Sequence, residues 1–211
     1  MTEEAVDAGT ARDVEKPTEG ARAAPSNLRS ALGVLVLAAG FALVPRVTKG
    51  CEAASLDEDA PDWEAKVVAN ASALPGADPG AASNGPVVAP THLKLENLRG
   101  HPVILDFWAT WCGPCQMEAP VVNTIAQRYK DRGLAVIGVN TSDEDGLAAQ
   151  FIRQKHLGFP VVYDEGNRIA KKYGVTNLPT LIVVSKTGKV VAIRTGVTSD
   201  SALDDIVRRY L

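Results

Sequence analysis

A pair of cysteines at the junction of a strand and a helix is the feature that most constrains how this chain can fold. Residues 103–107 form a short apolar run interrupted by a single acid, which predicts a buried central strand. Residues 113–129 carry apolar side chains at helical spacing, with Pro120 expected to kink the helix. The sequence Trp-Cys-Gly-Pro-Cys stands between them, so both sulfurs belong to the end of the strand and the first turn of the helix.

Strands and helices continue to alternate along the rest of the chain. Further strands are predicted over residues 134–139, 160–163, 180–184 and 190–194, the last two joined by a Ser-Lys-Thr-Gly turn. Further helices are predicted from Ser142 to about His156 and over residues 167–173. Thr198 or Ser199 is predicted to cap a last helix, with Ala202, Ile206 and Val207 facing inward. This order predicts an α/β fold over residues 91–211, a length sufficient for one core.

The first 90 residues differ in character and are predicted to lie outside that domain. Residues 1–30 show no sustained apolar period, which predicts a disordered tail. Residues 31–45 form an uncharged run that is short for a bilayer-spanning helix and ordinary for a signal-peptide core. We expect a retained membrane anchor, with a cleaved signal or a buried helix as alternatives. Residues 46–90, rich in Ala, Pro, Gly, Ser and Asn, predict a flexible linker.

Composition excludes several classes of protein. Net charge is −3, with 45% hydrophobic and 22% charged residues, which argues against a polytopic membrane protein and a wholly disordered chain. No basic excess points to nucleic acid as a partner. Three cysteines are too few for a disulfide-dense secreted scaffold. One of them, Cys51, lies in the predicted linker, where we expect a free thiol rather than an acylated lipoprotein cysteine.

The other two cysteines, Cys112 and Cys115, are placed for disulfide exchange. A sulfur at a helix start lies beside unpaired backbone N–H groups and the positive end of the helix dipole, which stabilise the attacking thiolate. Cys115, one turn on, can reach the first sulfur and release a bound partner. Pro114 at an early helical position removes only an N–H that has no partner within the helix.

Two alternatives to redox chemistry stay open on the residues alone. A zinc site would need further ligands, and the histidines, His92, His101 and His156, show no ligand spacing. A purely structural disulfide would close too small a loop to stabilise the fold much. A Cys-x-x-Cys pair between a strand and a helix favours redox catalysis over both.

Residues 106–115, with Met117 to Pro120 after them, resemble a thioredoxin-fold active site, and residues 174–180 resemble the cis-proline loop of that fold. Within the fold, the chain resembles the TlpA/ResA group of membrane-tethered extracytoplasmic thiol-disulfide oxidoreductases. That subgroup is indicated by the Phe-Trp-Ala-Thr-Trp-Cys sequence, by Glu118 two residues before Pro120, and by an additional helix and strand over residues 142–163. The resemblance implies a thioredoxin-like fold: a central mixed sheet with helices on both faces and an extra β/α insert, preceded by a membrane segment and a flexible linker.

The resemblance implies roles for individual residues. Cys112 becomes the nucleophile and Cys115 the resolving thiol. Pro179 is expected to form a cis bond with Leu178 beside the sulfurs and to expose backbone with which a substrate can pair. The expected active-site and substrate-binding residues are Trp111, Gly113, Pro114, Leu178 and Pro179, whereas Trp108 is expected in the core.

Two acids complete the expected catalytic set. Asp106 matches the buried acid beneath the active site of thioredoxin, where many members of the tethered group have Asn. Burial would raise its pKa and make it a proton shuttle for Cys115, the alternative being a buried acid satisfied by hydrogen bonds. Glu118 corresponds to the active-site Glu of the subgroup, the alternative being a solvated acid on the helix surface.

The resemblance predicts an enzyme that reduces the disulfides of partner proteins on the extracytoplasmic (periplasmic) side of a membrane, with cytochrome c biogenesis as a candidate task. It implies no metal and no cofactor beyond the Cys112–Cys115 disulfide. The expected partners are disulfide-bearing clients and a membrane electron-transfer protein that returns the pair to the dithiol form. A disulfide donor or isomerase, or a thiol-based chaperone or copper-binding module, are the alternatives.

Overall fold

A computed structural model describes residues 54–75 and 92–211, and the apolar runs of the sequence become the central strands of its sheet. β3 (Val103–Trp108) lies in the interior of the sheet with all six residues buried. It runs parallel to β4 (Ala135–Asn140) on one side and antiparallel to β6 (Thr180–Val184) on the other. Strands buried on both faces are continuous in apolar character, which is why their sequences predicted them to within a residue.

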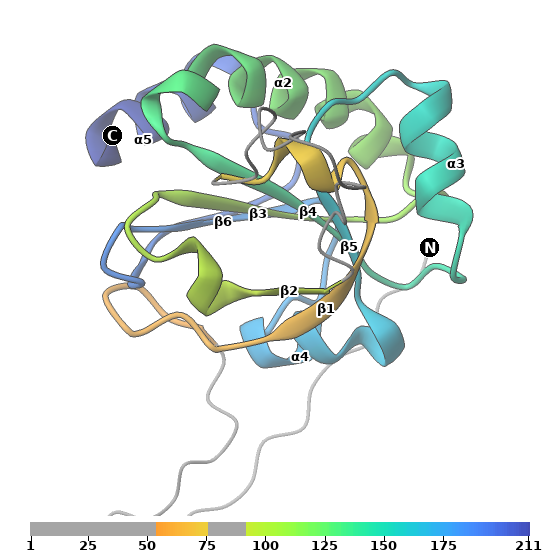
Figure 1. Ribbon diagram of the computed structural model, residues 1–211, viewed down its shortest axis with the longest axis horizontal. Coiled ribbons are helices and arrows are strands. Elements are labelled where there is room, and N and C mark those ends of the chain that lie inside the picture. Colours follow the sequence, from red (N-terminus) through yellow and green to blue (C-terminus); the bar gives the residue numbers. More distant parts are fainter. Residues whose placement is uncertain (1–53, 76–91) are drawn as a thin grey trace, which may run out of the picture. The chain divides into compact units, whose positions relative to one another are not determined.

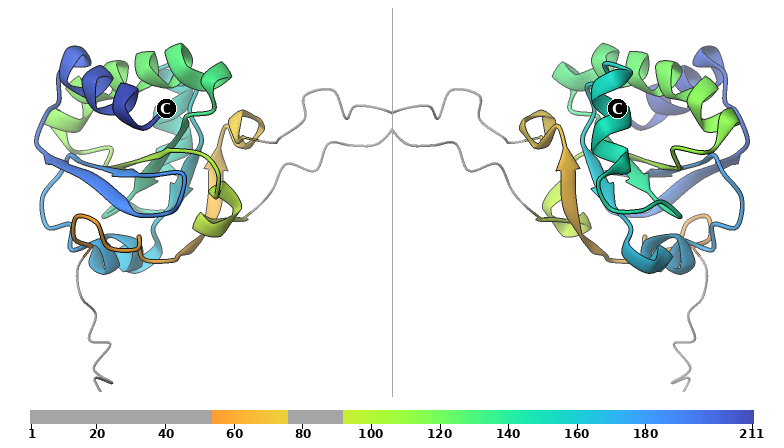
Figure 2. Two further views of the ribbon diagram at one scale, coloured as in Figure 1. Left: turned by 90° about the vertical axis from the view of Figure 1, so that its left-hand side faces the viewer. Right: turned by 90° about the vertical axis from the view of Figure 1, so that its right-hand side faces the viewer.

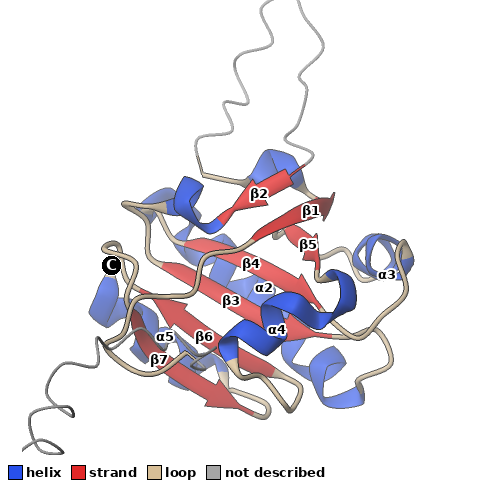
Figure 3. Cartoon of the chain, turned by 90° about the horizontal axis from the view of Figure 1, so that it is seen from below, coloured by secondary structure: helices blue, strands red, loops and turns tan. Residues whose placement is uncertain are grey.

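The outer strands make the sheet mixed. β5 (Val161–Tyr163) is parallel to β4, and β7 (Val190–Thr195) pairs with β6 as the predicted hairpin. Within the described residues the sheet has seven strands in the order β2-β1-β5-β4-β3-β6-β7 (Figure 3). The carboxyl ends of β3 and β4 therefore lie at the same edge as the start of β6, and this edge carries the cysteines.

Helices cover both faces of the sheet, as predicted (Figures 1 and 2). α2 (Gly113–Tyr129), α3 (Leu147–Gln154) and α5 (Asp200–Tyr210) pack on one face, and α4 (Arg168–Tyr173) packs on the other. Single turns of 3-10 helix occur at Ala71–Ala73, Leu95–Leu98, Lys130–Arg132 and Glu165–Asn167. The architecture is the thioredoxin-like α/β fold, and α3 with β5 forms the additional helix and strand.

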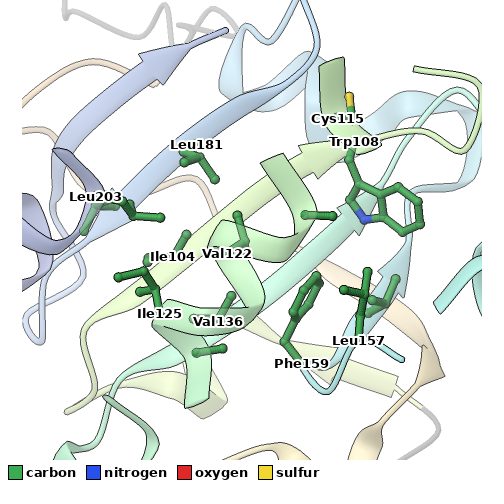
Figure 4. Close-up of a cluster of buried hydrophobic side chains, with 14 of the residues drawn as sticks. Ile104, Trp108, Cys115, Val122, Ile125, Val136, Leu157, Phe159, Leu181 and Leu203 are labelled. Atoms are coloured by element: carbon green, nitrogen blue, oxygen red, sulfur yellow. The ribbon is translucent and has the colours of Figure 1, made fainter. Parts of the chain in front are cut away.

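Alternate residues of the central strands serve two separate cores. Ile104 of β3 packs in the cluster beneath α2, together with Val122 and Ile125 (Figure 4). Leu105, its neighbour, lies in the opposite cluster together with Ile169 of α4. The period of two along a strand thus places successive side chains against different helices. Both layers pack against the strand that leads to the first cysteine.

The edge of the sheet beyond β5 is built from residues far apart in the sequence. β1 (Glu64–Ala69) pairs antiparallel with β5 on one side and with β2 (His92–Lys94) on the other. Trp63, immediately before β1, is buried, as is Leu74 after it. Residues 54–75 are thus an integral part of the folded domain.

The prediction of a flexible linker over residues 46–90 is therefore wrong for residues 54–75, and the domain does not begin at residue 91. The prediction rested on composition, and the Ala, Pro and Gly of the flanking segments concealed a six-residue strand. Strand β1 is specified by its pairing with β5, whose residues follow much later in the chain. Such tertiary pairing overrides local propensity.

One helix boundary and one inward-facing position differ from the predictions. α3 begins at Leu147 rather than near Ser142, because Ser142 and Gly146 both adopt positive φ (60° and 94°) and break the helical path. α5 begins at Asp200 with Ser199 as its cap, which confirms one of the two predicted caps. This register buries Leu203 and leaves Ala202 exposed, so the inward position predicted for Ala202 is wrong, whereas Ile206 and Val207 are buried as predicted.

The predicted tail over residues 1–30, the predicted anchor over residues 31–45 and Cys51 all lie outside the described residues. In the part of the chain that the structure does describe, no helix has both the length and the apolar character needed to cross a membrane.

Candidate active site

Cys112 and Cys115 form a disulfide at the start of α2. Cys112 is the N-cap residue of the helix, and Cys115 lies in its first turn. The Cα atoms of the two cysteines are 5.2 Å apart. The Sγ of Cys112 accepts a hydrogen bond from the backbone N–H of Cys115 at 3.2 Å. Pro114 lies in the same turn, as predicted. The first sulfur thus lies against the unpaired N–H groups of a helix N-terminus, which can stabilise a thiolate when the disulfide is reduced.

The loop before β6 lies beside this disulfide. The peptide bond between Leu178 and Pro179 is cis, which confirms the sequence prediction. β6 is antiparallel to β3 with Thr180 opposite Phe107, so Pro179 lies next to the end of the strand that leads to Cys112. The carbonyl of Pro179 accepts a hydrogen bond from the N–H of Gly196 at 2.9 Å, which ties this loop to the segment after β7.

Asp106 lies inside β3, the strand that leads to Cys112, and is buried. Its Oδ1 has no hydrogen-bond partner among the described residues, so the alternative of an acid satisfied by hydrogen bonds is not supported for that oxygen. Burial holds the pKa of Asp106 well above its ordinary value, and the neighbouring charge of Glu118 raises it further. A carboxyl with a raised pKa holds a proton more readily than an ordinary one.

Glu118 lies one turn after Cys115 and is only 1% exposed, so the alternative of a solvated acid on the helix surface is wrong. One oxygen, Oε1, accepts a hydrogen bond from the backbone N–H of Thr198 at 2.7 Å. The other, Oε2, is buried without a partner in the described part of the chain. Burial raises the pKa of Glu118, and the hydrogen bonds from Thr198 partly oppose that shift.

Thr198 is a site residue that the sequence pattern indicated only as a possible helix cap. It lies in the loop between β7 and α5, 80 positions after Glu118. In that loop, the N–H of Gly196 donates to the carbonyl of Pro179 and the N–H of Thr198 donates to Glu118. The loop therefore links the cis-proline loop to the buried acid. No local pattern marks a backbone N–H as a ligand for a distant carboxylate, and only the fold reveals this contact.

The two tryptophans near the disulfide differ in environment. Trp108 is buried in the core, as predicted. Trp111 is 65% exposed immediately before Cys112, and its indole N–H donates to the carbonyl of Ser142 at 2.9 Å. Gly113 follows Cys112 with open space where a Cβ would stand.

Large exposed apolar side chains gather around the disulfide. Among the described residues there are five such side chains, and three of them are Trp111, Met117 (69% exposed) and Val197 (49% exposed). Met117 lies on α2 two residues after Cys115, and Val197 lies between the two residues that hold Pro179 and Glu118. An apolar surface around a redox-active pair suits contact with a protein client. Within the described ranges, no three side chains of His, Cys, Asp or Glu are grouped so as to hold a metal ion.

Comparisons with known proteins agree with this geometry. Residues 56–193 match the AhpC/TSA family. The chain is 35% identical over 117 residues to thiol-disulfide oxidoreductase ResA of Bacillus thuringiensis subsp. konkukian, which covers 56% of this chain and 68% of that protein. It is 29% identical over 172 residues to ResA of Bacillus subtilis, covering 82% and 85% of the two chains. A solved structure from Chlorobium tepidum, assigned as thiol:disulfide interchange protein DsbE, matches with a TM-score of 0.61 and 27% identity over 75% of this chain and 99% of that one.

Proposed function

Because the chain belongs to the AhpC/TSA family and is a thiol-disulfide oxidoreductase of the thioredoxin fold, we propose that it reduces disulfides of partner proteins through Cys112 and Cys115. The observation that carries the proposal is the position of the pair, with the first sulfur at the N-terminus of α2 and the second one turn behind it. The exposed apolar side chains around the pair favour a protein client over a small molecule.

The proposed cycle transfers two electrons and two protons to the client. The thiolate of Cys112 attacks one sulfur of a client disulfide, the client S–S bond breaks, and the expelled client thiolate takes up a proton. Cys115 then loses its proton and attacks the sulfur of Cys112 in the mixed disulfide. The second client thiolate leaves and is protonated, and the Cys112–Cys115 disulfide seen in the structure remains. A dithiol donor must reduce that disulfide before the next turnover.

Asp106 and Glu118 are the proposed proton acceptors for the second step. Both are buried, each has one oxygen without a partner among the described residues, and the charge of Glu118 acts on Asp106. A carboxyl with a raised pKa can take the proton of Cys115 as that thiol attacks and pass it on afterwards. In this proposal Leu178 and Pro179 present backbone to the client, and Trp111 provides part of the apolar contact surface.

We further propose that residues 31–45 anchor the protein to a membrane and that the redox domain acts on the extracytoplasmic side. Support comes from the uncharged run in the sequence and from the resemblance to a membrane-tethered group. A membrane electron-transfer protein would supply the reducing dithiol, and a disulfide between the cysteines of apocytochrome c is the proposed substrate. Fractionation of cells that produce the full chain, with protease added from outside the membrane, tests this location.

Replacement of Cys112 by Ser tests the mechanism. We expect the C112S chain to lose insulin-disulfide reduction, and retained turnover would refute the proposed nucleophile. The direction of electron flow is tested by the reduction potential of the pair in the full chain. A value near or below about −250 mV supports a reductant, and a value near −150 mV or above would make the protein a disulfide donor or isomerase.

A further inference from the structure

The loop between β4 and α3 holds the two residues that precede the first cysteine. The carboxylate of Asp143 accepts two hydrogen bonds from Thr110, one from its backbone N–H at 2.7 Å and one from its hydroxyl at 2.9 Å. The carbonyl of Ser142 accepts the indole N–H of Trp111 at 2.9 Å. The path of the chain into Cys112 is therefore set by a loop that lies 33 positions later in the sequence than Thr110.

Asp143 is itself anchored. Its Oδ2 also accepts a hydrogen bond from the side-chain amide of Asn140 at 2.6 Å, and its carbonyl accepts one from the hydroxyl of Tyr163 at 3.2 Å. These donors lie at the ends of β4 and β5, so the carboxylate is fixed by the sheet. Hydrogen bonds to a carboxylate are charge-assisted and stronger than neutral ones, which suits a rigid support.

The same loop is held on its other side by Asn167, the residue before α4. The side-chain oxygen of Asn167 accepts hydrogen bonds from the hydroxyl of Thr141 at 2.9 Å and from the N–H of Ser142 at 2.7 Å. Ser142 has φ 60°, a left-handed conformation that costs energy in a residue other than glycine. Such a conformation persists where surrounding contacts determine it, and here it directs the carbonyl of Ser142 at Trp111.

A second acid of the same loop provides the contrast. Asp145 lies two positions after Asp143, and its carboxylate pairs with Lys66 at 3.0 Å. Both of those side chains are 54% exposed. An exposed ion pair of this kind contributes little to stability. Two aspartates in one loop thus have different tasks, and only Asp143 contacts the segment that carries the nucleophile.

We propose that Asp143 is a positioning residue for the redox reaction, which holds Thr110 so that the sulfur of Cys112 stays at the N-terminus of α2. It acts through Thr110 and forms no part of the surface that meets the client. The inference rests on the proposed function in that Cys112 is taken as the attacking thiol. A displacement of about 1 Å in a reacting group can cost up to about 10²-fold in rate, so support two residues away has a measurable effect.

The test is the rate at which iodoacetamide alkylates Cys112 in the reduced full chain at pH 7, with fragment-ion mass spectrometry assigning the label to Cys112. We expect D143A to react about tenfold more slowly, because the sulfur leaves the helix N-terminus that stabilises its thiolate. D143N keeps one acceptor oxygen and should react at an intermediate rate. T110V removes one donor without changing any charge and should also slow the reaction, and it serves if D143A does not fold. D145A is the matched control and should react as the parent does.

The sign of the change separates the possible roles of Asp143. A carboxylate that acted only as a nearby negative charge would oppose the thiolate, so its removal would speed alkylation. Faster or unchanged alkylation in D143A, or an unchanged rate in T110V, would overturn the proposal. Because alkylation needs no client, a chain that shows the expected rates but never reduces insulin would refute the proposed function and leave the role of Asp143 standing.

Discussion

The two ends of α2 differ in the carboxyl groups that lie on them or beside them. Near its start, Glu118 and Asp106 are buried, each has one oxygen without a partner among the described residues, and both have raised pKa values. At its end, Arg128 and Tyr129 bond Asp204 of α5 at 2.7 and 2.6 Å. The hydrogen bonds from Tyr129 and Arg128 lower the pKa of Asp204. Both arrangements join α2 to α5 or to the loop before it, yet one opposes ionisation and the other favours it.

This difference distinguishes a contact that stabilises the packing of α2 and α5 from carboxyl groups that are suited to proton transfer. A partly exposed acid with several donors around it links two elements at the surface, and ion pairs of this kind contribute modestly to stability. A buried carboxyl with an unpaired oxygen costs stability, because ionisation in an apolar site is unfavourable. The buried carboxyls that resist ionisation lie near the disulfide, whereas the hydrogen-bonded carboxylate lies at the far end of the helix. We infer that the carboxyls at the start of α2 serve proton transfer.

The substitution D106N should have the largest effect. We expect insulin-disulfide reduction to fall by about 10²-fold, because Cys115 loses the base that accepts its proton. The free energy of unfolding at neutral pH should rise by about 1–2 kcal/mol, since a buried group that resists ionisation is replaced by a neutral one. Urea unfolding and the insulin assay measure the two quantities. A loss of activity together with a loss of stability would show a structural role instead.

The substitution E118Q should have a smaller effect. The amide oxygen of Gln can still accept the N–H of Thr198, so the loop before α5 keeps its place and only the exchangeable proton is lost. We expect turnover to fall by about tenfold, within the lower part of the range for general acid–base groups. If turnover in E118Q equals that of the parent, Asp106 alone carries the proton and the comparison applies to one acid only.

The pH dependence of stability should differ in sign between the two ends. A carboxyl whose pKa is raised by folding binds more protons in the folded state, so Asp106 and Glu118 make stability fall as pH rises from the ordinary carboxyl pKa toward the raised one. The lowered pKa of Asp204 has the opposite consequence: its contribution is present above the ordinary pKa and is lost as pH falls through the lowered one. Urea unfolding from pH 2 to pH 8 measures both trends, the loss from Asp204 at the acid end and the fall from Asp106 and Glu118 above it. The fall with rising pH should become smaller in D106N, and an unchanged slope would contradict the assignment.

The substitution D204N should have the smallest effect. We expect disulfide reduction within twofold of the parent and a slight loss of thermal stability that diminishes in 1 M salt, because salt screens exposed charges. The far end of α2 would join the functional site if D204N reduced turnover as strongly as E118Q does.

Much of the fold could be predicted from the sequence because its central elements are locally specified. β3, β4 and β6 are buried on both faces, so their apolar runs mark them to within a residue. The bounds of α2 follow from helical spacing and from the cysteine and proline residues at its start. β1 escaped prediction because its partner strand β5 follows far along the chain and its own composition resembles the segments around it.

By itself, the sequence determined the strand, the Cys-x-x-Cys turn and the helix, because each of these is encoded by neighbouring residues, and the resemblance to the thioredoxin fold indicated the cis-proline loop. Only the tertiary structure decided that Glu118 is buried against Thr198 and that Asp143 holds Thr110. Those contacts span 80 and 33 positions and form where loops from separate strands meet at one edge of the sheet. A side chain's environment depends on what the fold brings to it, and no local pattern encodes that.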